Sequence, residues 1–182
     1  EFGADKFGAL ASPNSTLEEF YLLQKIVRGL DSPHVDHRLR EMDTRDEANM
    51  PAFPGLNMPI EALEQADAIL LIGSNLQKEQ PIAALRVRKA TLKGASVSVI
   101  NPVDYNFNFK VAAKHIVAPQ AVLESLQQLV AALNDSASSA ESAQIAAQLR
   151  GKQNAIVLVG ALAAHHPQAA SIRALAEQIA AL

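Results

Sequence analysis

A short polar turn after an apolar run is the first place where this sequence could do chemistry. Gly73-Ser74-Asn75 comes directly after the continuously apolar run Ala68–Ile72. Glycine lets the backbone approach a ligand, and small hydroxyl and amide groups can donate hydrogen bonds to phosphate oxygens. The same three residues also suit a tight turn at a strand exit. The motif therefore supplies candidate ligand-binding residues and leaves the plain structural interpretation open.

Two further turns follow apolar runs in the same way. Asn101-Pro102-Val103-Asp104 comes after Val97–Ile100, and Gly160 comes after Ala155–Val159. The Asp104 carboxylate suits a ribose or a guanine base edge, although an aspartate in such a place more often caps a turn. Neither a G-x-G-x-x-G dinucleotide fingerprint nor a G-x-x-x-x-G-K-[ST] phosphate loop occurs in the chain. The candidate binding residues are Gly73, Ser74, Asn75 and Asp104, with Gly160 a weaker candidate.

Residue types and spacing indicate no catalytic or metal-binding set. The chain has no cysteine, which excludes disulfides, thiolate-bound zinc, cysteine nucleophiles and iron–sulfur ligation within these residues. Its histidines include His34 with His37 and His165 with His166, but no third ligand stands at a recognisable spacing. No serine occupies a G-x-S-x-G elbow, and no acid–base pair or triad is evident. We therefore predict no catalytic residue and no metal ligand.

The composition indicates a folded domain that neither binds nucleic acid nor spans a membrane. The chain has 182 residues, of which 49% are hydrophobic and 19% charged, and its formal net charge is −3. Its densest basic stretch, Arg86–Lys89, is expected to be a solvated helix face. No apolar run reaches the roughly 18 residues that a membrane-spanning helix requires. The chain opens on Glu1, and Leu182 lies within a helical pattern, so we expect a piece of a longer protein.

Up to residue 66 the pattern predicts a strand, two helices and a long connection. Phe7–Ala11 is predicted to be a buried strand, and Ser15 with Glu18 a capping box. The helix that follows ends near Gly29 and carries one apolar stripe, made of Phe20, Leu23, Val27 and Leu30. Residues 34–59 are expected to be a long connection, followed by a short helix over Ile60–Ala66.

Beyond residue 66, apolar strands alternate with amphipathic helices. Strands that are buried on both faces are predicted at Ala68–Ile72 and Ala155–Val159, with further strands at Val97–Ile100 and His115–Val117. Helices are predicted over Pro81–Lys93, from Val122 to Leu133, and from Ile172 to Leu182. Asn134–Ser142 is expected to be a surface linker leading into a weak helix up to Arg150.

This alternation is typical of an α/β fold, doubly wound, with a mostly parallel sheet and helices on both faces. Ligands of such folds bind at the loops after the carboxyl ends of the strands. We expect residues 1–182 to form a single α/β domain or a fragment of one. Its main unit would span 1–134, a linker and weak helix 135–153, and the start of a further strand–helix unit 154–182.

Several stretches resemble the molybdopterin oxidoreductase family, namely Ala66–Asn75, Pro81–Arg88, Gly94-Ala95 and Asn101-Pro102. Others are similar to one group within it, the large iron–sulfur subunit of bacterial NADH-quinone oxidoreductase, or complex I. These stretches are Ala9–Glu19, Leu22–Lys25, Val35–Arg40, Val157–Gly160 and His166–Ala170. The resemblance covers nearly the whole chain and implies a Rossmann-like fold of the molybdopterin oxidoreductase type.

The resemblance also has implications for cofactors. In molybdenum enzymes of the family, a Gly-Ser-Asn turn contacts the pyrophosphate of a guanine-dinucleotide pterin, and Gly73, Ser74 and Asn75 match that turn. A second turn of Asp-Pro-Arg type holds more of that cofactor, whereas Asn101–Asp104 contains no arginine. The complex I subunit is regarded as having kept the fold and lost molybdopterin, and its iron–sulfur clusters lie in another part of the subunit. The resemblance therefore implies a vestigial site at Gly73, Ser74, Asn75 and Asp104, and no cofactor in this chain.

The implied function is that of a non-catalytic scaffold in a subunit that carries electrons from NADH through iron–sulfur clusters toward quinone. The implied partners are other domains of the same subunit and neighbouring peripheral-arm subunits, on the cytoplasmic side of the bacterial inner membrane, without membrane insertion or nucleic acid. An alternative is a molybdopterin guanine dinucleotide-binding domain of a molybdenum oxidoreductase. A third interpretation is a nucleotide-binding domain of another oxidoreductase or a decarboxylase.

Overall fold

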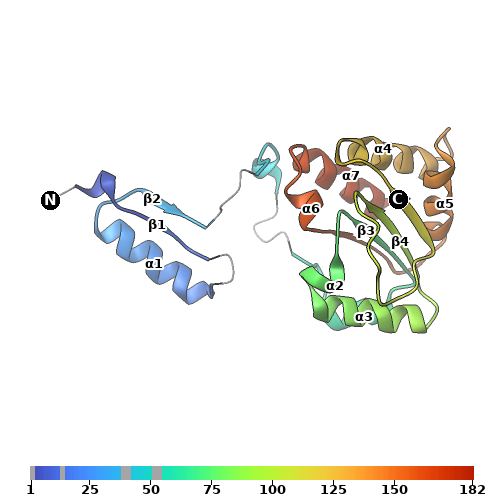
Figure 1. Ribbon diagram of the computed structural model, residues 1–182, viewed down its shortest axis with the longest axis horizontal. Helices are drawn as coiled ribbons and strands as arrows, with labels where there is room; N and C mark the ends of the chain where they lie inside the picture. Colours follow the sequence, from blue (N-terminus) through green and yellow to red (C-terminus); the bar gives the residue numbers. More distant parts are fainter. Residues whose placement is uncertain (1–2, 13–14, 38–41, 51–54) are drawn as a thin grey trace. The chain divides into compact units, whose positions relative to one another are not determined.

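The computed structural model describes residues 3–12, 15–37, 42–50 and 55–182. The chain divides into two compact units, residues 1–41 and residues 42–182 (Figure 1). Among the described residues, the first unit contains a two-stranded parallel sheet and the second a four-stranded parallel sheet. All four candidate binding residues lie in the second unit.

The first unit is a strand–helix–strand motif. A short 3₁₀ turn, η1 (Ala4–Lys6), precedes β1 (Gly8–Leu10), and α1 (Leu17–Gly29) connects β1 to β2 (His34–Asp36). The first strand and the end of the helix at Gly29 are where the sequence predicts them. The prediction that this strand is buried is wrong, because Leu10 is 55% exposed. The long connection predicted for residues 34–59 is wrong at its start, where β2 pairs in parallel with β1. Three residues with a single apolar side chain are too short a pattern to indicate a strand.

The predicted capping box of α1 is displaced by one residue. Thr16 is the N-cap, because its hydroxyl accepts from the Glu19 N–H at 3.3 Å and the Glu19 carboxylate accepts from the Thr16 N–H at 2.8 Å. Ser15 with Glu18 has the same spacing, so the pattern alone could not separate the two pairs. Of the predicted apolar stripe, only Val27 is buried, and Leu30 is exposed at the C-cap.

The sheet of the second unit has the strand order β5–β4–β3–β6, with all neighbours parallel. The strands are β3 (Ala68–Ile72), β4 (Ser96–Asn101), β5 (Ala113–Ile116) and β6 (Ala155–Val159). The chain proceeds from β3 to β4 to β5 in one direction and then returns to place β6 on the other side of β3. The strand order therefore reverses between β3 and β6, as in a doubly wound fold.

Helices cover both faces of this sheet (Figure 1). One face carries η3 (Ile60–Gln65) and α3 (Pro81–Leu92), and the other carries α4 (Val122–Leu133), α5 (Ala140–Leu149) and α7 (Ala169–Ala181). All five residues of β3 are fully buried, since its side chains alternate between the two layers. The predicted α/β fold with helices on both faces is confirmed.

The burial of β6 differs from the prediction. Ile156 is buried, but Ala155 is exposed and Val159 is 38% exposed. β6 lies at an edge of the described sheet, where it pairs with β3 alone. A run of five apolar residues looks the same in an edge strand and in a central strand, so the sequence could not separate these positions.

The helices after residue 59 are largely where the sequence places them. The predicted Ile60–Ala66 helix is a 3₁₀ helix, η3, and α7 ends at Ala181 with Leu182 exposed. α5 begins at Ala140, inside the predicted linker, because the Ser139 hydroxyl caps it by accepting from the Ser142 N–H at 3.2 Å. Within the described ranges, no helix combines the length and the apolar character needed to cross a membrane.

Ion pairs fasten η3 to α3. Arg86, Lys89 and Lys93 all approach the Glu64 carboxylate, Lys89 at 3.1 Å and Lys93 at 3.7 Å. Hydrogen bonds, chiefly from Arg86 and secondly from Lys89, lower the pKa of Glu64 to about 2. The basic stretch Arg86–Lys89, predicted to be a solvated face, therefore forms ion pairs that connect α3 to η3.

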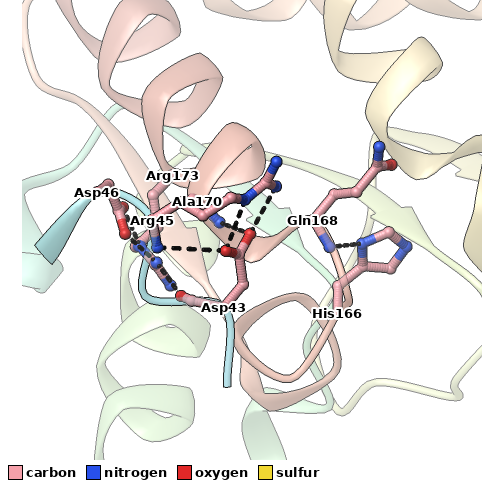
Figure 2. A network of polar contacts seen from close by, with 7 residues as sticks. All are labelled: Asp43, Arg45, Asp46, His166, Gln168, Ala170 and Arg173. Atoms are coloured by element: carbon pink, nitrogen blue, oxygen red, sulfur yellow. Dashed lines mark hydrogen bonds and ion pairs between the residues drawn. The ribbon is translucent and has the colours of Figure 1, made fainter. Parts of the chain in front are cut away.

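A second polar network fastens residues 43–46 to α7 (Figure 2). The Arg173 guanidinium donates to the Asp46 carboxylate at 2.5 and 2.7 Å and to the Asp43 carbonyl at 2.7 Å. The Asp43 carboxylate accepts from the Ala170 N–H at 3.0 Å and from the Arg45 guanidinium at 2.8 Å. Hydrogen bonds, from Arg45 to Asp43 and from Arg173 to Asp46, hold the pKa of both carboxyls below the ordinary value.

We expect acid to weaken the second unit through this network. A carboxyl with a depressed folded-state pKa stabilises the fold fully above its unfolded pKa, about 3.9 for aspartate, and loses that contribution as pH falls toward the folded value. Asp46→Asn should lower the free energy of unfolding at neutral pH by about 1–2 kcal/mol. It should also flatten the decline of stability below about pH 5.

Urea denaturation at a series of pH values measures both effects. Asp5→Asn, which changes an exposed aspartate of the first unit, is the control and should leave the pH profile of the second unit unchanged. An identical pH profile for wild type and Asp46→Asn would contradict the expectation.

Candidate functional site

The candidate site lies where the strand order reverses. The turn Gly73–Asn75 follows β3 and Gly160 follows β6, so the two turns leave the same edge of the parallel sheet beside each other. In open α/β sheets, ligands bind in the crevice outside the carboxyl ends of the strands at such a point. The turn predicted from the sequence is therefore at the position where this fold class binds ligands.

Gly73 is enclosed by backbone atoms. Its φ of +57° lies in the left-handed region, which glycine tolerates. Its N–H donates to Ile100 O at 2.9 Å, and its carbonyl accepts from the Leu162 N–H at 3.0 Å. A Cβ at this position would lie 2.6 Å from Ala163 N. Both backbone polar groups of Gly73 are therefore used, and no side chain fits there.

Gly160 has the matching place on the neighbouring turn. Its N–H donates to Ile72 O at 2.8 Å, and a Cβ there would overlap the Cα and Cβ of Ser74. Its φ of −91° is open to any residue, so the lack of space, rather than the backbone conformation, requires glycine. The turns after β3 and β6 are thus packed backbone against backbone.

Asn101, at the end of β4, holds the backbone of Ser74. Its Oδ1 accepts from the Ser74 N–H at 2.8 Å, and its Nδ2 donates to Ser74 O at 2.8 Å. Asn101 is 0% exposed and Ser74 is 1% exposed. A side-chain amide presents an acceptor and a donor together, so it satisfies both buried backbone groups of Ser74 at once.

Glu79, the last residue of α2 (Leu76–Glu79), accepts hydrogen bonds from both turns. Its Oε1 accepts from the Asn75 N–H at 2.6 Å. Its Oε2 accepts from the Ala161 N–H at 2.9 Å and lies 3.4 Å from the donating Ser74 hydroxyl. Ala161 opens α6 (Ala161–Ala164), directly after Gly160. A half-buried carboxylate therefore joins the turn after β3 to the turn after β6.

Three of the four predicted binding residues come together here, and the fourth is engaged elsewhere. Gly73, Ser74 and Asn75 form the turn after β3. The Asp104 carboxylate is exposed and accepts from Lys114 Nζ, on β5, at 2.6 Å. The hydrogen bonds described for the Gly73–Asn75 turn do not include Asp104.

Sequence reasoning missed Glu79 and gave Asn101 no partner. A signal for Glu79 was present, because it stands four residues after Asn75 and a carboxylate one helical turn on can reach back to a cap N–H. The pairing of Asn101 with Ser74 joins positions 27 residues apart. That pairing depends on the register of β3 with β4, which local sequence does not specify.

The histidines of the second unit make structural contacts. His166 Nδ1 accepts from the Gln168 N–H at 3.0 Å (Figure 2), which leaves Nε2 to donate to Pro119 O at 3.1 Å. His115 Nε2 lies 3.1 Å from the Ser125 hydroxyl. Across the described ranges, no group of three or more His, Cys, Asp or Glu side chains is arranged to hold a metal ion.

The sequence matches the molybdopterin oxidoreductase family over residues 3–182. It is 37% identical over 102 residues to the F420-dependent formate dehydrogenase subunit alpha of Methanocaldococcus jannaschii, which covers 54% of this chain and 15% of that protein. It is 31% identical over 121 residues to the assimilatory nitrate reductase catalytic subunit of Bacillus subtilis, covering 64% and 17%. The NADPH-Fe(3+) oxidoreductase subunit alpha of Geobacter sulfurreducens is 29% identical over 102 residues, covering 54% and 12%. The chain thus spans less than a fifth of each of these relatives.

We expect the backbone contact between the two turns to tolerate no added methyl group. Gly160→Ala should lower the free energy of unfolding by at least about 2 kcal/mol, because the new Cβ overlaps Ser74. Urea denaturation, followed for the unit that carries each substitution, measures the loss. Gly29→Ala is the control, since a Cβ there meets nothing within 4 Å, and its effect should stay within about 1 kcal/mol. Equal losses in the two variants would contradict the expectation.

Proposed function

Because the chain belongs to the molybdopterin oxidoreductase family, we propose that it is a non-catalytic structural domain of a larger electron-transferring oxidoreductase. The proposed parent is the large iron–sulfur subunit of an NADH-quinone oxidoreductase, which passes electrons from NADH through iron–sulfur clusters toward quinone. One observation carries the proposal: each backbone N–H of the Gly73–Asn75 turn already donates to an acceptor of the chain itself.

That observation is a test of fit for the guanine-dinucleotide pterin of molybdenum enzymes. A pyrophosphate at a strand-exit turn requires backbone N–H groups that are free to donate. Here the acceptors are Ile100 O, Asn101 Oδ1 and Glu79 Oε1. The two turns also pack closely against each other, since a Cβ on Gly160 would overlap Ser74. The residues present therefore do not fit this cofactor, which supports a domain that works without it.

The proposed role is to pack against other domains of the same subunit and neighbouring peripheral-arm subunits, on the cytoplasmic side of the bacterial inner membrane. The first unit supports such docking, because α1 leaves several large apolar side chains exposed, with Leu17 at 79%. The others on this helix are Tyr21, Leu22 and Ile26. An exposed apolar patch on a protein surface often marks an interaction site.

The relatives favour a second candidate function. Two of them are named formate dehydrogenase and nitrate reductase subunits, and the Gly73–Asn75 turn occupies the ligand position of the fold. The second candidate is therefore a molybdopterin guanine dinucleotide-binding domain of a molybdenum oxidoreductase. In that case Glu79 must leave the Asn75 N–H when the cofactor binds.

Purification of the parent protein with an antibody raised against this chain separates the two candidates. We expect the eluted protein to contain iron without stoichiometric molybdenum and to reduce quinone with NADH. A mock purification with pre-immune antibody supplies the background for both measurements. Stoichiometric molybdenum in the eluted subunit would overturn the proposal and favour the second candidate.

Ligand titration of the chain itself is an independent test. A ligand at 100 times its dissociation constant stabilises the native state by about 2.7 kcal/mol. We expect neither GDP nor NADH to raise the melting temperature saturably, with sodium sulfate at matched ionic strength as the salt control. A saturable rise with GDP would contradict a domain without a nucleotide site.

A further inference from the structure

We propose that the Glu79 carboxylate occupies the anion position between the turns after β3 and β6, and that it thereby excludes phosphate-bearing ligands. This inference deepens the proposed function, on which it rests, because it names the residue that closes the site.

The Glu79 carboxylate is surrounded by donors in the way that a bound anion would be. The Asn75 N–H lies 2.6 Å from one of its oxygens, and the Ala161 N–H lies 2.9 Å from the other. The Ser74 hydroxyl approaches the second oxygen at 3.4 Å. These donors come from two turns, and Ala161 is 82 residues from Glu79 in the sequence. Hydrogen bonds to an ionised oxygen are stronger than those between neutral groups, so a carboxylate competes directly with a phosphate for these donors.

The other acceptors of the turn belong to the sheet. Gly73 donates to the backbone of Ile100, and Ser74 donates to the buried amide of Asn101. Displacing the Ile100 carbonyl or the Asn101 side chain would disrupt the carboxyl end of β4. Glu79 differs because it is a half-buried side chain at the end of a four-residue helix. It can therefore be shortened without opening the core, and its removal leaves the Asn75 and Ala161 N–H groups facing the volume that the carboxylate filled.

The experiment compares wild type, Glu79→Ser and Glu141→Ser in the full 182-residue chain. Glu141 is an exposed glutamate in the first turn of α5, so it controls for loss of a carboxylate away from the site. The probe is inorganic pyrophosphate, followed through the backbone amide resonances of Asn75 and Ala161. We expect Glu79→Ser to bind pyrophosphate saturably at both amides, at least about tenfold more tightly than wild type or Glu141→Ser.

Glu79→Gln keeps the test decisive if Glu79→Ser fails to fold. It retains the side-chain volume and one acceptor oxygen but loses the negative charge and frees one of the two N–H groups, so a smaller gain than that of Glu79→Ser is expected of it. If neither variant gains affinity, or if the shifted amides lie away from Asn75 and Ala161, the inference is overturned and the proposed function stands. Saturable binding of pyrophosphate to the wild type at these amides would overturn both.

Discussion

The backbone contact between the turns after β3 and β6 is the constraint on which the rest of the second unit depends. Gly160 lies against Ser74 and Gly73 lies against Ala163, so neither turn accepts a Cβ. Hydrogen bonds from Gly160 to Ile72 and from Leu162 to Gly73 continue the pairing of β3 with β6 beyond the strand ends. The position of α6 follows from this contact, because Leu162 and Ala163 of α6 lie against Gly73.

The central position of β3 imposes a matching requirement on the two helical layers. Leu70 and Ile72 contribute to one apolar cluster and Ile69 and Leu71 to the other, so both faces must be covered at once. α3, which covers one face, comes soon after β3 in the chain. α4, α5 and α7, which cover the other face, come only after β5. The layer formed by α4, α5 and α7 is stabilised by charge as well as by apolar packing. Arg173 of α7 donates hydrogen bonds to Asp43 and Asp46 at the start of the unit. Removing one partner of such a half-buried pair leaves the other unpaired, which costs more than the pair contributes.

How far the sequence predicts this structure depends on whether the determining contacts are local. β3, β4, α3 and α4 could be predicted because a continuous apolar run or a helical stripe is a local signal that two covered faces reinforce. The edge position of β6 and the existence of β2 depend on which strands pair, and neighbouring residues carry little information about that. The Gly73–Asn75 turn could be found as a candidate, since it ends a buried strand. Of its internal acceptors, Glu79 left a local signal, because it stands four residues after Asn75. Asn101 left none, because it is 27 residues from Ser74, and Ala161 reaches Glu79 only through the three-dimensional fold.

An internal acceptor changes what this turn contributes to the protein. In some folds the backbone N–H groups after a strand have no acceptor within the protein and donate to a ligand. The apparent stability of such a fold rises with ligand concentration, because the ligand binds only the native state. In this chain Ile100, Asn101 and Glu79 satisfy those groups from within, so these donors do not require an anion from solution. A buried donor without an acceptor would cost about 1–3 kcal/mol, and the Asn101 side chain removes that cost for the buried Ser74 N–H. A domain whose role is to hold neighbours in place benefits from this arrangement, because its geometry does not change with the occupancy of a site.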